Sequence, residues 1–176
     1  MKINRQVVIS VGVLVLSGLL ISSLNYFRLQ RHMNEAVSFY ETGTVLRAHY
    51  GFFVNPTVLV LNMIRPGEES SRATNFYTLL KFSELVKDQE FSVVELQYNG
   101  SPRFLIKGDY FRKLGEEFSW QNPVYTLQHF PENLLNPDGS AAYPTWEGGW
   151  LGVSSKQLQD ANDFHDKWYL DESLKN

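Results

Sequence analysis

The sequence predicts an α+β protein in which one membrane-spanning helix precedes a domain with an antiparallel or mixed sheet and helices on one face. Three observations support this fold class. An uncharged apolar run extends from Gln6 to Phe27. Two segments rich in β-forming residues flank the turn dipeptide of Asn99 and Gly100. Segments with strand and helix periodicity alternate through the rest of the chain.

The run from Gln6 to Phe27 has the length of a membrane span, since a hydrocarbon core roughly 30 Å thick requires about 20 apolar residues. Its apolar residues lie on every side of the helix, as expected when lipid surrounds it. A cleaved signal peptide is the closest alternative, because Lys2 and Arg5 precede the run, but no A-x-A-like cleavage site follows. Tyr26 and Phe27 end the run with ring types that prefer the headgroup zone, which favours a retained signal anchor.

The cations that flank the span predict its orientation. Lys2 and Arg5 lie before it, together with the free amine, and Arg28 and Arg31 lie after it. Positive residues beside a span stay on the cytoplasmic side. The small bias predicts a cytoplasmic N-terminus and an extracytoplasmic body, which is periplasmic if the chain is bacterial.

Residues 28–43 are predicted to form a juxtamembrane helix, because four apolar residues recur at helical spacing and share one face. These residues are Leu29, Met33, Ala36 and Tyr40. The face is too short for a reliable coiled coil before Gly43 ends it. Two interpretations follow: the helix packs on its own domain, or it forms the stalk of a dimer.

A first strand is predicted over Thr44–Val54 and a second over Thr57–Ile64. The second is an almost continuous run of aliphatic residues, which is typical of a strand buried on both faces. A helix then extends to Lys87 from Ser70 or Ser71, either of which can supply its N-cap.

A β-hairpin is predicted from Phe91–Tyr98 and Arg103–Lys107, since Asn99-Gly100 tolerates the positive φ angles of a type I′ turn. The register that follows pairs Tyr98 with Ser101, Leu96 with Arg103, and Val94 with Leu105. Pro102 lies opposite Gln97 and has no N–H to donate, so this arm of the hairpin is expected either to lie at an edge of the sheet or to pair loosely near the turn.

Three further elements complete the chain. Asp109 is predicted to cap a short helix over Tyr110–Phe118, and a strand follows over residues 124–130. Ser154 begins a C-terminal helix, with Gln157 at capping-box spacing.

The core order is then strand, helix, strand, strand, helix, strand, which is the βαββαβ order of a ferredoxin-like sandwich. The predicted divisions are a tail at 1–5, the span at 6–27, the juxtamembrane helix at 28–43, a single α+β domain at 44–170 and a tail at 171–176. A shared order of elements carries no activity by itself. Function therefore has to be sought in particular side chains.

Composition argues against several classes of protein. Four of the 16 Lys and Arg lie beside the span, so the body has 12 of them against all 19 Asp and Glu and a net charge near −7. A surface of that sign repels phosphate backbones, and nucleic-acid binding is not expected. The absence of cysteine removes thiol nucleophiles, disulfides and thiolate metal sites. No cofactor motif occurs, and none is expected to bind.

No catalytic residues are predicted, because the chain has no G-x-S-x-G, Walker or H-E-x-x-H motif. His165 is the one histidine with close acidic neighbours, among them Asp163 and Asp166. On a helix, however, His165 points about 100° away from Asp166. These three residues are therefore weak candidates for a metal or acid–base site, and a solvated acidic face beside a packed histidine is expected instead.

The long connection between residues 131 and 152 holds the best candidates for a ligand or partner contact. Tyr143, Trp146 and Trp150 alternate there with proline and glycine. Long loops are uncommon in compact domains and are enriched in function. Exposed aromatic rings can stack on sugars or anchor a protein partner. The alternative is that the three rings fold inward and cover the core.

These observations predict a single-pass membrane protein whose domain binds or organises other membrane or envelope proteins without catalysis. A second copy of the chain is an alternative partner, through the juxtamembrane helix. The second hypothesis is a module that binds a small ligand or glycan through residues 143–150. The third is a hydrolase that uses dispersed carboxylates with His129 or His165.

Overall fold

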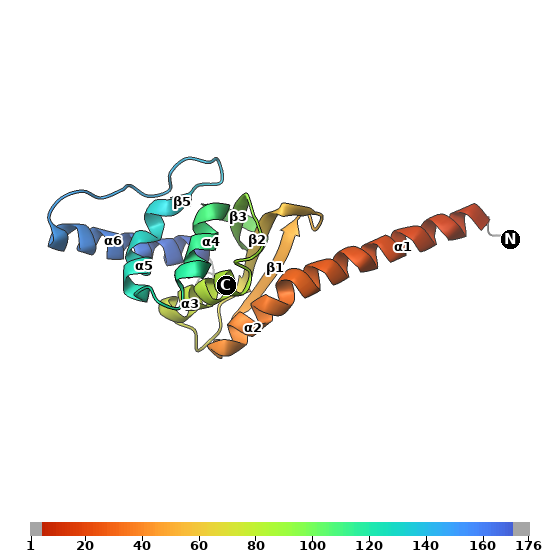
Figure 1. The fold of residues 1–176 in the computed structure, drawn as a ribbon, viewed down its shortest axis with the longest axis horizontal. Helices are drawn as coiled ribbons and strands as arrows, with labels where there is room; N and C mark the ends of the chain where they lie inside the picture. The colour runs from red at the N-terminus through yellow and green to blue at the C-terminus, as the bar shows by residue number, and fades with distance from the viewer. Residues whose placement is uncertain (1–4, 171–176) are drawn as a thin grey trace.

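The computed structural model describes residues 5–170, so the predicted tails at 1–5 and 171–176 lie, apart from Arg5, outside the described residues. A long helical segment projects from a body built on a five-stranded sheet (Figure 1). The strands are β1 (Val45–Gly51), β2 (Asn55–Arg65), β3 (Val93–Tyr98), β4 (Ser101–Lys107) and β5 (Leu134–Leu135). The α-helices are α1 (Arg5–Asn25), α2 (Arg31–Phe39), α3 (Arg72–Leu85), α4 (Gly108–Glu117), α5 (Pro123–His129) and α6 (Trp150–His165). Shorter π and 3₁₀ segments are η1 (Tyr26–Gln30), η2 (Pro131–Asn133) and η3 (Asp166–Leu170).

The sheet is mixed, which confirms the predicted α+β class. Its strand order is β1-β2-β3-β4-β5, and β2 pairs with β3 in parallel while the other neighbours are antiparallel. Helix α3 makes the crossover that a parallel pair requires. The ferredoxin-like order is not confirmed, because chain neighbours are sheet neighbours throughout and residues 123–129, expected to supply the last strand, form α5.

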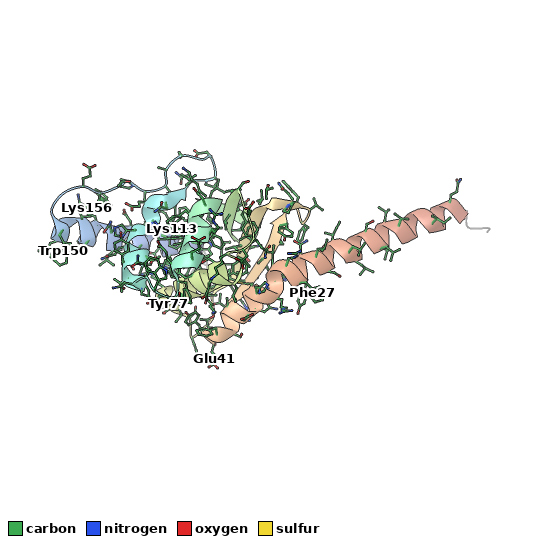
Figure 2. All side chains as sticks on the ribbon, viewed as in Figure 1. Phe27, Glu41, Tyr77, Lys113, Trp150 and Lys156 are labelled. Atoms are coloured by element: carbon green, nitrogen blue, oxygen red, sulfur yellow. The ribbon has the colours of Figure 1, made fainter. Side chains whose placement is uncertain are left out.

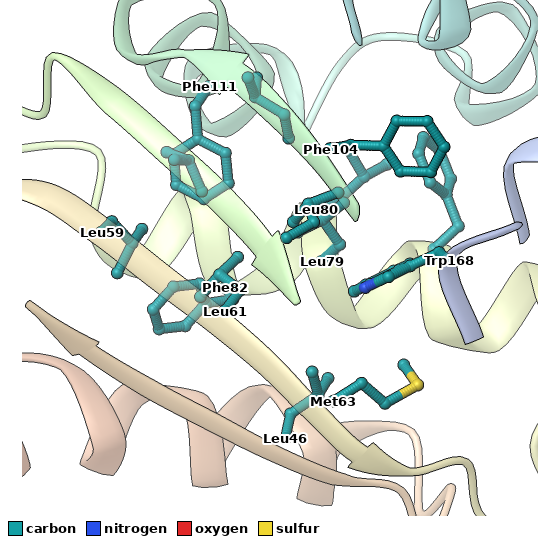
Figure 3. Packing of buried hydrophobic residues seen from close by; sticks show 14 of the residues in the cluster. Leu46, Leu59, Leu61, Met63, Leu79, Leu80, Phe82, Phe104, Phe111 and Trp168 are labelled. Atoms are coloured by element: carbon teal, nitrogen blue, oxygen red, sulfur yellow. The ribbon is translucent and has the colours of Figure 1, made fainter. Parts of the chain in front are cut away.

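One face of the sheet carries the hydrophobic core. Alternate residues of β2 and their partners on β1, β3 and β4 are buried there. They include Leu46, Ala48, Leu59, Leu61, Met63, Val94, Leu96 and Ile106. Helices α3 and α4 contribute Leu79, Leu80, Phe82 and Phe111 to the same cluster (Figure 3). These helices therefore cover the core face.

The opposite face of the sheet is more open. Asn62 and Glu95 are half-buried there and Arg47 is exposed, whereas Val60 is buried between neighbouring strands. The centre of β2 is thus buried on both faces, as its aliphatic run predicts, while its ends are not. An antiparallel or mixed sheet with one partly solvated face is common in α+β domains.

The N-terminal helix continues into the core. The backbone at Asn25, Gln30 and Arg31 keeps α-helical angles, so α1, η1 and α2 follow one another without a break. Leu29 and Met33 of this segment are fully buried against the body. The apolar face of residues 28–43 therefore packs on its own domain, and it is not available as the seam of a dimer stalk.

The predicted hairpin at Asn99 and Gly100 is confirmed. Both residues have positive φ angles, 48° and 79°, and Tyr98 lies opposite Ser101 as predicted. A register shift between Leu96 and Gln97 then moves the partners by one residue. Leu96 lies opposite Phe104 and Val94 opposite Ile106, so the predicted pairs with Arg103 and Leu105 are wrong. Pro102 lies opposite Gln97 as predicted, but β4 is not an edge strand, because it also pairs with β5 at Leu105 and Ile106.

The first predicted strand is too long. Strand β1 ends at Gly51, and the chain reverses at Phe52 and Phe53, which have φ angles of 49° and 64°. Val54 donates its N–H to the carbonyl oxygen of Gly51 at 3.1 Å, which closes a β-turn centred on Phe52 and Phe53 within the three-residue loop between β1 and β2. Bulky aromatic residues rarely adopt positive φ, so sequence patterns assign them to strands instead.

The predicted strand over residues 124–130 is wrong. Asn122 accepts a hydrogen bond from the N–H of Val124 at 2.9 Å, and Pro123 occupies the first helical position of α5. This N-cap and proline pair favours a helix and prevails over the β-forming residues that follow. The fifth strand is instead the two-residue β5.

The helix ends also differ from the prediction. Helix α6 begins at Trp150, four positions before Ser154, so Ser154 and Gln157 lie inside it and form no capping box. Asp109 lies within the first turn of α4 and accepts a hydrogen bond from Tyr110 N–H at 2.8 Å. The predicted cap of α3 is confirmed at Ser71, whose hydroxyl accepts from the N–H of Thr74 at 3.1 Å.

Candidate functional site

Tyr143 belongs to the core. It is buried, and its ring lies beside Phe104 with 6.0 Å between centroids. Its hydroxyl donates a hydrogen bond to Oδ2 of Asp163 at 2.9 Å. Burial and this carboxylate both raise the pKa of Tyr143 above its usual value, so the phenol stays protonated. The ring thus fastens the connection between β5 and α6 to the body.

Trp146 lies along α6 and is partly covered. Its indole N–H donates a hydrogen bond to Oδ2 of Asp160 at 2.7 Å. The ammonium of Lys156 lies 4.2 Å from the ring centroid, in the geometry of a cation–π contact. One face of the indole is therefore occupied by a side chain of α6.

Trp150 differs from the other two rings because it is 76% exposed. Leu151, beside it, is 73% exposed, and Leu158 follows about two turns later on α6 and is 42% exposed. We call these three residues the distal ridge. It lies on α6, whose first residue is at the end of the body remote from the free length of α1 (Figures 1 and 2).

The three acidic and histidine candidates on α6 and η3 do not converge. Asp163 binds Tyr143 and lies 2.7 Å from Nζ of Lys167, whereas Asp166 forms an ion pair with Arg72. His165 faces the core instead. Among the side chains that the structure describes, no three histidine or acidic groups are arranged to hold a metal ion.

His165 is buried beside Phe76 and Phe164, with ring centroids 6.4 Å and 4.8 Å away. Nδ1 lies 3.2 Å from the hydroxyl of Tyr169, and no partner in the described part of the chain reaches Nε2. Burial, with a smaller contribution from Arg72, lowers the pKa of His165 to about 3. The imidazole is therefore neutral at physiological pH and serves as a packed ring.

His129 lies in a different environment, at a cavity of about 240 Å³ between α4 and α5. Tyr110, Glu117 and Glu132 also line this cavity. The His129 ring stacks on Tyr125, with 4.1 Å between centroids, and Nδ1 donates to the backbone oxygen of Tyr125 at 2.9 Å. The sequence gives no sign of this cavity, because it depends on how two helices pack.

The end of α1 is a second region of interest, and the sequence predicts only part of its contacts with the body. Asn25 is 6% exposed, and its side-chain amide bonds to the backbone of both Tyr50 and Phe53. Gln30 likewise accepts from the N–H of Ala48 at 2.8 Å and donates to the carbonyl oxygen of Leu46 at 3.1 Å. These two amides hydrogen-bond to backbone groups at the free edge of β1, which would otherwise be unpaired.

Within the described residues, one helical segment is long and apolar enough to cross a membrane, and most of its apolar window is exposed. Comparison with known proteins adds nothing to this geometry, since no family model, curated protein or solved structure matches the chain. Function is therefore inferred from the residues themselves.

Proposed function

We propose that this chain is a single-pass membrane-anchored protein whose extracytoplasmic α+β domain is a non-catalytic interaction or assembly module. The anchor is α1, whose apolar side chains from Val11 to Leu24 are mostly exposed and need a hydrocarbon environment. The cations before the span favour a cytoplasmic N-terminus. The body then lies outside the cytoplasm, in the periplasm of a bacterial cell.

Rigid attachment supports an assembly role. Because Leu29 and Met33 are buried in the core, the anchor and the body form one continuous unit without a flexible linker. A rigid anchor fixes the position of the body relative to the axis of α1. Such a geometry suits a protein that presents a defined surface to a neighbour.

The distal ridge gives the most direct support for a role in interaction. Trp150 and Leu151 are large apolar side chains at the first turn of a helix, and both are mostly exposed. Tryptophan is the residue type most enriched among interface residues that dominate binding energy. The partner we propose is a membrane or envelope protein, and a second copy of this chain is the alternative.

A module for a small ligand or glycan is the second candidate, favoured by the exposed ring of Trp150. The burial of Tyr143 and the Lys156 contact on Trp146 weaken it, because a sugar platform needs several free ring faces. A hydrolase centred on His129 has the cavity between α4 and α5 in its favour. Neither alternative is supported as directly as the interaction role, which rests on the exposed residues of the distal ridge.

A site-specific photo-crosslinker tests the proposal. It replaces Trp150 in the full chain expressed in its native membrane, and a matched probe replaces exposed Lys113 on α4. We expect a discrete adduct from position 150 and none from position 113. An adduct of twice the chain mass would identify a second copy as the partner. Illumination that yields no adduct at position 150 would contradict the proposal.

A further inference from the structure

The turn between β1 and β2 carries aromatic residues in a backbone conformation that disfavours them. Phe52 and Phe53 occupy the two central positions of the turn, with φ angles of 49° and 64°. Turns of this type favour asparagine and glycine, because both central residues need positive φ. The chain follows that preference at its other hairpin, where Asn99 and Gly100 have φ angles of 48° and 79°.

The two hairpin turns of the chain have similar positive φ angles but carry different residues. Both turns reverse an antiparallel pair of strands, so an Asn-Gly pair would satisfy the backbone at either place. Two phenylalanines add strain to the turn and gain little burial. Phe52 is 92% exposed, and Phe53 and Val54 are 53% and 62% exposed. Phe53 stacks on His49 with 4.2 Å between ring centroids, so folding explains this ring in part, but it does not explain Phe52.

The position of the turn indicates what the rings contact. The Asn25 side chain donates a hydrogen bond to the backbone oxygen of Phe53 at 2.8 Å, and Asn25 is the last residue of α1. The turn is thus fixed beside the point where the apolar helix enters the body. Figure 1 shows the β1–β2 turn on the side of the body from which α1 projects. Tyr26 and Phe27, the next residues along the helix, are also exposed.

We propose that the turn of Phe52, Phe53 and Val54 is a second membrane contact, which inserts into the headgroup zone of the leaflet that α1 crosses. Together with Tyr26 and Phe27, it forms an aromatic belt around the exit of the helix. Aromatic rings favour this depth because an apolar ring and a hydrated backbone can both be satisfied there. The proposal rests on the membrane anchor proposed above.

Two contacts with the same leaflet have a consequence for the body. A single helix leaves a domain free to rotate about the helix axis. The β1–β2 turn lies to one side of that axis, and Asn25 and Gln30 hold β1 against the helix. The inserted turn therefore defines which side of the body faces the membrane.

The absence of cysteine allows a direct test with single-cysteine probes. Full-length V54C and L14C proteins are labelled with an environment-sensitive fluorophore and reconstituted into vesicles of phosphatidylcholine and phosphatidylglycerol. Lipids with a nitroxide on the acyl chain supply the quencher. D138C, in an exposed turn remote from α1, is the aqueous control. We expect blue-shifted, quenched emission from positions 54 and 14 and unquenched emission from position 138.

The variant F52N/F53G gives the second arm of the test. It places the residue pair of positions 99–100 at the two positions of the β1–β2 loop that have similar positive φ angles, so we expect a body about as stable in detergent as the parent. In vesicles, the V54C probe on this background should lose most of its quenching while the L14C probe keeps it. These opposite responses separate a membrane contact from a structural role.

The two proposals fail in different ways. Quenching at position 14 with an aqueous spectrum at position 54 would overturn the membrane contact of the turn and leave the anchor intact. Aqueous spectra at both positions would overturn the anchor and the turn contact together. Equal quenching at position 54 with and without F52N/F53G would also overturn the role of the aromatic pair.

Discussion

The side-chain oxygen of Asn25 accepts a hydrogen bond from the backbone N–H of Tyr50 at 2.8 Å, although the two residues belong to the apolar helix and the edge strand. The same side chain donates to Phe53, at the end of that strand. Exposed edge strands invite pairing with other chains. The exit of the helix therefore has a structural role: it hydrogen-bonds to the edge of β1 and holds the β1–β2 hairpin beside the apolar helix α1.

The first prediction concerns this contact. Asn25→Ala should lower the free energy of unfolding by about 2 kcal/mol, because it removes the part-buried hydrogen bonds to the backbone of Tyr50 and Phe53. Chemical unfolding of the full chain in detergent measures the change. Asn34→Ala is the matched control, because this exposed side chain has one hydrogen bond, from Gln30. An equal effect of the two substitutions would contradict the assigned role of Asn25.

The second prediction compares two helical glycines. A Cβ on Gly115 of α4 would lie against the backbone of Ser83 in α3, with 2.6 Å to its carbonyl carbon. Gly115→Ala should therefore destabilise the body by about 2 kcal/mol, as overpacking does. A Cβ on Gly152 of α6 meets nothing within 4 Å, so Gly152→Ala should be neutral or stabilise by about 0.5 kcal/mol. If the two substitutions lowered the unfolding midpoint equally, α3 and α4 would not pack as closely as the structure shows.

The third prediction separates the aromatic residues of the 143–150 segment. Tyr143→Ala removes a buried ring and its bond to Asp163, so it should cost about 3 kcal/mol. Trp150→Ala removes an exposed side chain and should change stability by less than about 0.5 kcal/mol. With the photo-crosslinker placed at exposed Leu151 instead, the Trp150→Ala protein should lose the crosslinked partner. A loss of folding with Trp150→Ala would instead identify this ring as part of the core.

The parts of the fold that were predictable have strong local signals. Asn99-Gly100 encodes its own backbone angles, and Ser71 encodes a helix start through one side-chain hydrogen bond. The register shift between Leu96 and Gln97 is different, because the turn dipeptide does not encode it; it lies beside the pair of Gln97 with Pro102, which has no N–H to donate. Strand β5 has two residues, which is too short for any periodicity to appear. Its pairing with β4 depends on contacts far apart in the chain.

The candidate site was predictable only to the level of residue types. Aromatic side chains in the segment of Tyr143, Trp146 and Trp150 indicate either a surface or a core, and the structure divides them: one is buried, one partly covered and one exposed. The Phe52-Phe53 turn was missed because propensity places phenylalanine in strands. A positive φ at these residues is visible only once the hairpin is formed.

The last prediction is a pH dependence of stability that originates at His165. Its pKa in the folded chain is about 3, against 6.5 for an unburied histidine, because burial disfavours the imidazolium. Between these values the unfolded chain binds a proton that the folded chain does not, so the stability present above pH 6.5 is lost as the pH falls toward 3. Between pH 7.5 and pH 5 the titration of this group should lower the free energy of unfolding by about 2 kcal/mol.

His165→Gln keeps a polar group near Tyr169 and does not titrate, so the free energy of unfolding of this variant should vary less over the same interval. Denaturant titrations of both proteins at the two pH values measure the difference, and parallel pH profiles would show that His165 is already accessible to protons in the folded state.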